Sequence, residues 1–412
     1  MANGKYVAPK DVYEYIVKIS GVDITELVDT CEIYQDIFNP VWSGNLAMSD
    51  TENLLMLLPI SIGDKVEITL ETRPPPGHPC TGKKKFIFFV SKIDDKEIVK
   101  ERHYVYNLQL ITKEFFKNEK LRVSEHFQGG PASIASSIIS GYGMGSLEIS
   151  NANYNYDIII PNMSPFVAVE YMATMAKAQG GADFAFFQKD IGGVFAFKSM
   201  EEMFKDDSGI ELVQENPNYR EDRESGNDKK NSYRTIQNMK FLGNIDSINN
   251  FAMGFFGSKI IKHDIINKKI TDSKYNYGQD NPTDKILKPF KGSIFEDCEE
   301  SNVSYLPVHS GIVQSMNPNE NAEMWKPSRK SNVMKFETNR AVIEIPGHAC
   351  LYKTIGKMIK IKMPSQETIE NVGQDKYLKG EYLVTAIRHT VKNKSYTIVM
   401  EIAKKRLKKV LE

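Results

Sequence analysis

The sequence predicts an α+β protein that is mainly β, with two similar antiparallel β domains on either side of a mixed region. The first observation is that apolar and polar side chains alternate over residues 63–70, the period of a half-buried strand. The second is that residues 356–363 repeat this pattern near the other end of the chain. The third is that the stretch between them combines helical and strand patterns. We therefore expect two copies of one small β domain with different material inserted between them.

The repeat extends beyond one strand. Each run opens with Ile-Gly, at Gly63 and at Gly356, and each is followed by two more strand-like segments. The spacing from Gly63 to Val90 is nearly equal to that from Gly356 to Val384. The alternative is that any two antiparallel meanders resemble each other at this level of detail. The shared Ile-Gly opening and the shared order of strands favour true repetition.

Composition and charge narrow the kinds of function that the protein can have. The chain has 412 residues, of which 41% are hydrophobic and 26% charged, as in ordinary globular proteins. The formal net charge is zero, so bulk attraction to nucleic acid or to an anionic membrane is not indicated. We find neither a spanning apolar run nor the apolar core of a signal peptide. We expect no membrane partner and assembly in a cytoplasm.

The first β domain is expected over residues 12–113. Its first strand is predicted where Tyr13, Tyr15, Val17 and Ile19 alternate with other residues. The further strands expected in this domain cover residues 32–34, 42–48, 63–70, 86–90 and 104–110. Consecutive prolines make residues 72–79 an exposed loop, because proline donates no backbone hydrogen bond.

An α+β middle region is expected over residues 114–340. Proline at the first helical position predicts helices over residues 131–140 and, after an N-cap at Ser164, to Gln179. A hairpin is predicted across residues 190–193. The polar stretch 205–234 predicts a charged surface loop. Residues 272–327 are rich in loop signals, and a helix is expected over 331–339.

The second β domain is expected over residues 341–403, and a basic C-terminal tail over residues 404–412. Its strands are predicted where residues 341–345, 359–363, 381–387 and 395–402 carry alternating or apolar patterns. The tail is expected to be helical.

The sequence contains no signature of catalysis, so we expect no catalytic residues, no cofactor and no metal. The motifs HExxH, GxSxG and the phosphate-binding lysine loop are all absent. His78 with Cys80, and His348 with Cys350, are the only pairs that suggest a tetrahedral zinc site. Their spacing is not that of a zinc finger or ribbon, and the repeat would not bring the two pairs together. Loops with thiols that pack as small apolar groups are the preferred interpretation.

Three parts of the chain resemble one protein family. Residues 32–40 (EIYQDIFNP), 44–50 (GNLAMSD) and 58–60 (LPI) resemble the first tube domain of the baseplate hub proteins of tailed bacteriophages. Residues 380–389 (GEYLVTAIRH) and 396–400 (YTIVM) look like the second tube domain of that family. Residues 160–162 and 184–194 match the middle region in style. The likeness thus touches most of the chain, with 205–234 and 272–327 unmatched.

This resemblance implies a structural function. Hubs of this family, related to the spike hubs of contractile injection systems, are homotrimers with two β-barrel tube domains in each subunit. Three subunits then form a pseudo-hexameric ring that adapts a hexameric tail tube to a trimeric central spike. The implied partners are the tail tube protein, the central spike protein and other baseplate proteins, with DNA only as passing cargo in the lumen. The implied location is the baseplate of the virion tail, after assembly in the host cytoplasm.

Four residues are the candidates for the assembly interface. If Val66, Ile68, Leu70 and their repeat counterparts Ile359, Ile361 and Met363 fill the barrels, the alternate residues point outward. We expect those outward residues to face a neighbouring barrel or the lumen: they are Glu67, Thr69, Lys360 and Lys362. The two pairs differ in charge, so acidic and basic faces would alternate around the ring.

Two other functions stay open. One is a tail-associated cell-wall hydrolase, although the sequence has no catalytic signature for it. The other is a different ring component of the tail, a tube initiator or a distal tail protein. Direct hexamerisation would favour that alternative, because a chain with an internal duplication needs only three copies for six positions.

Overall fold

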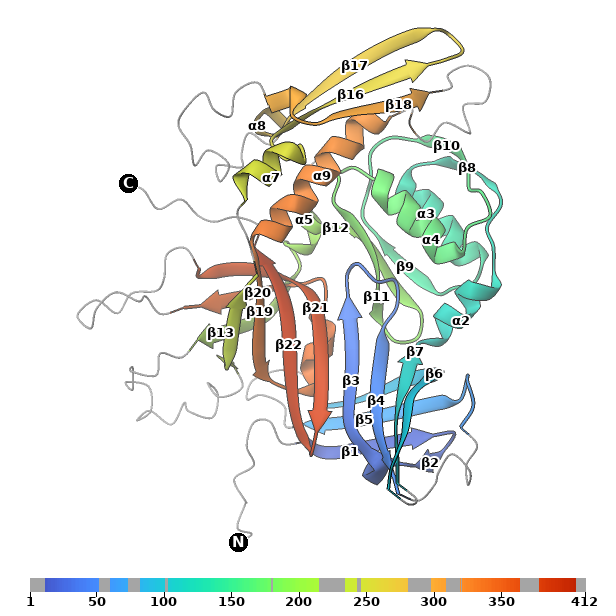
Figure 1. Ribbon diagram of the computed structural model, residues 1–412, viewed down its shortest axis with the longest axis vertical. Helices are drawn as coiled ribbons and strands as arrows, with labels where there is room; N and C mark the ends of the chain where they lie inside the picture. Colours follow the sequence, from blue (N-terminus) through green and yellow to red (C-terminus); the bar gives the residue numbers. More distant parts are fainter. Residues whose placement is uncertain are drawn as a thin grey trace, which may run out of the picture.

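The structure is a computed structural model that describes residues 12–51, 60–72, 82–100, 103–178, 181–214, 234–242, 246–280, 298–308, 319, 321–363 and 378–404. Strands dominate these residues, as the sequence predicts, and the α-helices among them lie in the middle region (Figure 1). None of the helices in the described residues is long and apolar enough to cross a membrane. The expected helical tail over 404–412 lies outside the described residues except for Lys404.

One curled sheet holds both copies of the repeat. Among the described residues it has 14 strands, and most follow the order β14-β13-β20-β21-β3-β4-β7-β6-β5-β1-β2. The remaining strands extend it from β22 through β19 to β15. Its N-terminal strands are β1 (Val12–Ile19), β2 (Val22–Asp23), β3 (Val28–Asp36), β4 (Ser43–Asp50), β5 (Lys65–Thr72), β6 (Lys83–Lys100) and β7 (His103–Ile111). A short 3-10 helix at Thr25–Leu27 precedes β3.

The later strands of this sheet come from two parts of the chain. Four of them form the C-terminal group: β19 (Arg340–Pro346), β20 (Met358–Lys362), β21 (Gly380–Lys392) and β22 (Ser395–Lys404). Three others come from the middle region: β13 (Asp207–Gln214), β14 (Thr235–Ile236) and β15 (Asn238–Phe241). A 3-10 helix at Ala349–Lys353 connects β19 to β20.

The alternating residues fill one continuous core. All six apolar residues assigned to the core from the repeat are buried: Val66, Ile68, Leu70, Ile359, Ile361 and Met363. They belong to one apolar cluster that joins the N-terminal and C-terminal strands. The two β units therefore share one core.

The first part of the middle region, up to Ser199, packs helices against two short sheets. Its three helices are α2 (Lys113–Lys120), α3 (Pro131–Gly141) and α4 (Pro165–Met175). Its short strands are β8 (His126–Gly129), β9 (Ser146–Ile149), β10 (Tyr156–Ile159), β11 (Phe184–Asp190) and β12 (Val194–Ser199). The predicted hairpin is confirmed as β11 and β12, which pair antiparallel. Residues on β11 point alternately into this region's own core and into the core of the large sheet, so the strand is apolar on both faces.

A further small sheet caps the end of the molecule opposite the N-terminal β unit (Figure 1). Its strands are β16 (Gly257–Asp264), β17 (Lys269–Asn276) and β18 (Val303–Val308), in the order β17-β16-β18. Four helices complete the chain: α5 (Met200–Met203), α7 (Ser247–Ala252), α8 (Tyr277–Asp280) and α9 (Ala322–Thr338). A 3-10 turn lies at Cys298–Glu300.

Several sequence expectations are wrong in their details. The charged loop expected over 205–234 is a strand, β13, over Asp207–Gln214, because it pairs with β20 and its acidic side chains meet lysines there. Residues 215–233 lie outside the described residues. Helix α4 ends at Met175 rather than Gln179, because Lys177 turns away to bridge Asn153. Ser164 holds the N-cap position, but its side chain makes no capping hydrogen bond.

Helix α9 begins earlier than predicted. It starts at Ala322 and contains Pro327, a residue that normally ends or interrupts a helix. Tertiary bonds hold it in place: the Arg329 guanidinium donates to the carbonyls of Ala173 and Phe184, each at 3.0 Å. Tertiary contacts here override the local signal, so the described part of residues 272–327 is less loop-like than the sequence predicts.

Candidate assembly interface

The Ile-Gly turn has the same geometry in both copies of the repeat. Gly63 and Gly356 both adopt positive φ, at 94° and 67°. The Gly63 amide donates to the Val90 carbonyl at 2.7 Å, and the Val90 amide donates back to Asp64 at 3.0 Å. In the second copy the Gly356 amide donates to Val384 and the Val384 amide to Lys357, both at 3.0 Å. Glycine suits this position because other residues rarely adopt positive φ.

The match continues along the strands. The register between β6 and β7 shifts between Val90 and Lys92, and that between β21 and β22 shifts between Val384 and Ala386. An irregularity of this kind at the same place in both copies is a specific structural feature. The order β3-β4-β7-β6-β5 in the first copy corresponds to β15-β19-β22-β21-β20 in the second. The repeat therefore covers five strands in each copy, more than the sequence predicted.

The first two candidate residues lie on β5. Glu67 accepts from Lys65 at 2.6 Å and from Lys85 at 2.8 Å. These lysines lower the pKa of Glu67 to about 2, chiefly through the hydrogen bond from Lys65. Thr69 is half-buried on the same face. The register of the repeat makes Glu67 the counterpart of Lys360, and Thr69 the counterpart of Lys362.

The other two candidates lie on β20 and meet acidic partners within the chain. Lys360 bonds to Asp207 at 3.0 Å and Lys362 to Glu211 at 2.8 Å, both across the parallel pair of β13 and β20. About half of each lysine side chain stays exposed. The structure thus brings Lys360 and Lys362 together with β13, and keeps them apart from Glu67 and Thr69 on β5.

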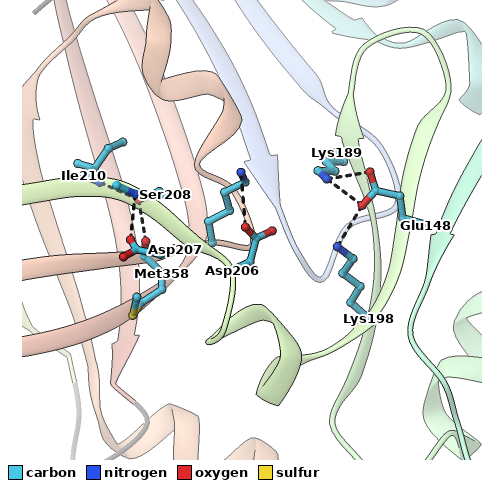
Figure 2. Close-up of polar contacts among 10 residues, drawn as sticks. Glu148, Lys189, Lys198, Asp206, Asp207, Ser208, Ile210 and Met358 are labelled. Carbon is cyan, nitrogen blue, oxygen red and sulfur yellow. Dashed lines mark hydrogen bonds and ion pairs between the residues drawn. The ribbon is translucent and has the colours of Figure 1, made fainter. Parts of the chain in front are cut away.

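The start of β13 is fixed firmly to β20 (Figure 2). The Ser208 hydroxyl donates to the Met358 carbonyl at 2.7 Å and accepts from the Ile210 amide at 3.2 Å. The Met358 amide donates to the Asp206 carbonyl at 2.9 Å. Figure 2 also shows Glu148 on β9 between Lys189 and Lys198, a contact that ties β9 to the β11–β12 hairpin. These contacts fix β13 to the large sheet and β9 to the β11–β12 hairpin.

The two copies of the repeat join through one strand pair, β21 with β3. Strand β21 uses the same edge twice: residues 380–383 pair with β20, and residues 386–392 pair antiparallel with β3. Figure 1 shows β3 and β21 side by side, although they are about as far apart in the sequence as the chain allows. This junction makes one sheet of the two copies, and the sequence analysis did not predict it.

Buried polar groups lie at this junction. His389, opposite Ile33 in the pairing, accepts or donates through Nδ1 to the Tyr396 hydroxyl at 2.7 Å. Burial lowers the pKa of His389 to about 3, so the imidazole is neutral near pH 7. Burial also raises the pKa of the Cys31 thiol, on β3, to about 12. These groups belong to the core and present no reactive side chain to solvent.

A polar face crosses the junction on the other side of the sheet. On β3 the residues between the buried ones are half-buried and polar, with the Tyr34 hydroxyl donating to Glu32. On β21 the corresponding Arg388 and Lys392 are exposed. The alternation of residues 31–36 gave a signal for this face, but only the pairing of β3 with β21 shows that it continues from one copy to the other.

The structure offers no clear site for catalysis among the residues that it describes. No group of three or more His, Cys, Asp or Glu side chains there is placed to hold a metal ion. The second His-Cys motif lies beside the end of β5, where the Ala349 amide donates to Thr72 Oγ1 at 2.8 Å. His78 and Cys80 themselves lie outside the described residues. Cys350 is disulfide-bonded, so the expectation that its thiol is free is wrong.

Comparison with known proteins agrees with this fold. No protein-family model and no curated protein sequence matches the chain. Among solved structures, it is similar to the 43 kDa tail protein of prophage MuSo2 from Shewanella oneidensis, with 10% identity and a TM-score of 0.56 over 94% of this chain and 97% of that one. It is also similar to the tail protein from Neisseria meningitidis MC58, with 9% identity and a TM-score of 0.52 over 95% and 97%. The expected fold class is confirmed, and the chain shares it with tail proteins.

Proposed function

We propose that this protein is a structural component of a phage tail, a baseplate hub that assembles as a homotrimeric ring. The observation that carries the proposal is the repeat, whose two copies already join edge to edge through β21 and β3. A chain built from two similar units supplies six similar positions from three copies. Such a ring has sixfold symmetry approximately and threefold symmetry strictly, which suits an adapter between a hexameric tail tube and a trimeric central spike.

The junction within the chain supports this arrangement physically. A strand edge has unpaired amide and carbonyl groups, and adding another strand satisfies them. The same kind of contact, repeated between subunits, closes a ring when the rotation per unit is sixty degrees on average. We propose that the two curled β units act as the tube domains of the ring. The first covers residues 12–113, and the second covers 341–403 together with β13, β14 and β15 from the middle region. The rest of residues 114–340 forms the region outside.

The proposal gives the four candidate residues a role in contacts between subunits. Lys360 and Lys362 are half exposed, so they can contact a neighbouring subunit while they hold β13. Glu67 and Thr69 lie at the equivalent place on the first copy, on a face with lysines on both sides of the carboxylate. We propose that each of these two faces lies next to side chains of opposite charge on a neighbouring unit of the ring.

The partners follow from the ring. One rim would bind the tail tube protein and the other the central spike, with other baseplate proteins outside and DNA passing through the lumen. The polar face across β3 and β21 suits a water-filled lumen, because its side chains are hydrophilic and its opposite face is buried. We propose a non-enzymatic role in the virion tail.

The solution mass of the purified chain tests the proposal. Light scattering with size exclusion is expected to give three times the chain mass of 46.8 kDa. Negative-stain images of the same sample should show a ring with a central opening. A stable hexamer would overturn the hub in favour of another ring component. A particle that stays monomeric with candidate tube and spike proteins present would overturn the ring, and peptidoglycan turnover by the pure chain would overturn the non-enzymatic role.

A further inference from the structure

Two strand edges correspond to the internal junction but have no such partner strand in the described part of the chain. In the junction, residues 386–392 of β21 pair with β3. The counterpart of this half of β21 is the distal half of β6, residues 92–100, and the counterpart of β3 is β15. Among the residues that the structure describes, the distal half of β6 pairs only with β7, and β15 pairs only with β19. Within this described part, each copy of the chain thus has two open edges of complementary kind.

The register of the repeat identifies equivalent residues on β6 and β21. Val90 pairs with Leu110, and Val384 pairs with Ile402, directly before the shared register shift. Counting five residues back along β7 and β22 makes Val105 equivalent to Thr397, and these pair with Glu97 and Thr390. Glu97 therefore corresponds to Thr390, and Ile98 corresponds to Val391.

The same reasoning relates β15 to β3. Gly44 on β4 pairs with Leu110, and Ala341 on β19 pairs with the equivalent Ile402. Gly44 in turn pairs with Ile33, and Ala341 with Phe241. Phe241 is thus the counterpart of Ile33, so Lys240 corresponds to Glu32 and Met239 to Cys31.

Burial differs sharply between the joined and the open edges. Ile33 and Val391 in the junction are 1% and 3% exposed. Their counterparts Phe241 and Ile98 are 48% and 69% exposed. Apolar side chains this exposed, on edges whose counterparts are buried by strand pairing, indicate that a partner covers them.

We propose that β15 of one copy pairs antiparallel with the distal half of β6 in a second copy of this chain. The internal junction sets the register, since Glu32 lies opposite Thr390 and Cys31 opposite Val391. Between copies, Lys240 then lies opposite Glu97, and Met239 opposite Ile98. An opposite-charge pair and an apolar pair are the cross-strand contacts that stabilise sheets. The inference rests on the proposed ring and identifies the residues through which its copies meet.

Cysteine cross-linking tests the register. The double variant Met239→Cys with Ile98→Cys, in the full chain, should form disulfide-linked species between copies under mild oxidation, seen on a non-reducing gel. Each single variant is the control and should form almost none, because Cys31 and Cys298 are buried and Cys350 is disulfide-bonded.

Charge exchange tests the same pairing without a covalent bond. Lys240→Glu should raise the protein concentration at which half of the chains are assembled by roughly five- to thirtyfold, because like charges across a strand pair repel. Adding Glu97→Lys should restore assembly. Lys269→Glu, at an exposed lysine on β17, is the matched control and should leave assembly unchanged.

The outcomes separate this inference from the proposed function. Cross-linking together with rescue by the double charge exchange supports the pairing. A trimer that neither cross-links nor responds to Lys240→Glu overturns the pairing and leaves the hub intact. A chain that never forms trimers overturns both.

Discussion

Gly63 and Gly356 occupy the same place in two copies of one hairpin, and each donates its amide to a valine carbonyl, Val90 at 2.7 Å and Val384 at 3.0 Å. Both glycines have positive φ, and both hairpins continue into the same register shift. A bond, a backbone conformation and an irregularity that recur together are more specific than alternating hydrophobicity. They make duplication the simplest description of the large sheet, and they allow each residue of one copy to be compared with its counterpart.

The two glycines should differ in their tolerance of a side chain. A Cβ at position 63 would meet nothing within 4 Å, whereas a Cβ at position 356 would lie 2.6 Å from Phe187 Cζ. Gly63→Ala should therefore cost about 1 kcal/mol, from backbone strain alone. Gly356→Ala should cost about 3 kcal/mol, because the strain is combined with overpacking against a buried ring. Urea unfolding at one fixed protein concentration measures both.

The neighbouring Phe187 provides the control for this comparison. Phe187→Leu removes the ring atoms that approach position 356, so it should recover part of the loss caused by Gly356→Ala and none of that caused by Gly63→Ala. Equal losses for the two alanine variants would contradict the packing difference.

The strands that carry a local pattern were predictable from sequence. The alternation over residues 63–70 and 356–363 predicts β5 and β20 and the burial of their apolar residues, because side chains of a strand alternate between two faces. The Pro131 start of α3 and the turn between β11 and β12 were predictable for the same reason. In each case the signal lies within a few residues.

The junction and the added strands were not predictable in this way. Strand β13 lies in a stretch rich in Asp and Glu, and its pairing depends on lysines about 150 residues later in the chain. The pairing of β21 with β3 joins segments from opposite ends of the chain, and no local pattern encodes which edges meet. Of the candidate site, the sequence gives the outward face of β5 and β20, while the junction and the open edges of β6 and β15 require the register.

Glu67 should make folding stability depend on pH in the acid range. Its pKa in the folded protein is about 2, below the usual 4.5, because Lys65 and Lys85 bond to the carboxylate. A group with a lowered pKa stabilises the fold above its unfolded pKa, and this contribution disappears as the pH falls from about 4.5 to about 2. Glu67→Gln should thus be less stable than the natural chain at pH 7 and equally stable near pH 2.

The measurement is the free energy of unfolding of both chains at a series of pH values and constant salt. Thr69→Ala, at the neighbouring outward position, lacks a titrating group and should shift stability by the same amount at every pH. A difference between Glu67→Gln and the natural chain that stays constant from pH 7 to pH 2 would argue against the lysine contacts.

His389 should add a second pH dependence, at higher pH. Burial lowers its pKa from 6.5 to about 3, so the folded protein keeps the imidazole neutral while the unfolded chain binds a proton below pH 6.5. Stability should therefore fall as the pH decreases from about 6.5 to about 3, by up to about 1.4 kcal/mol per pH unit. His389→Gln keeps a polar partner for Tyr396 and should remove this slope. The pH dependence of unfolding in the two chains tests it, and an unchanged slope in the variant would assign the effect to other groups.

Reversing Lys360 and Lys362 should reveal whether they act within or between chains. The double variant Lys360→Glu with Lys362→Glu is expected to weaken trimerisation, as proposed for these interface candidates. It also places like charges beside Asp207 and Glu211, which now bond to the two lysines. Adding Asp207→Lys and Glu211→Lys restores the contacts within the chain. Analytical ultracentrifugation of the double and quadruple variants separates the roles, since full recovery of the trimer by the second pair would argue against a contact between subunits.

Gln188 should be critical for the attachment of the middle region to the first β unit. Its Oε1 accepts from the Trp42 amide at 3.0 Å and from the Thr112 hydroxyl at 3.2 Å, and its backbone carbonyl accepts from Trp42 Nε1 at 2.7 Å. All three residues are buried.

Gln188→Met retains the volume of the side chain but leaves two buried donors without an acceptor, at a cost of about 1–3 kcal/mol each. Thr112→Val removes one donor and leaves the other bond to Oε1 intact, so it should cost about 1 kcal/mol. Thermal unfolding of the two variants should therefore show the larger loss of stability for Gln188→Met, because only that variant loses an acceptor shared by two buried donors. Equal losses of stability would mean that water replaces the missing acceptor.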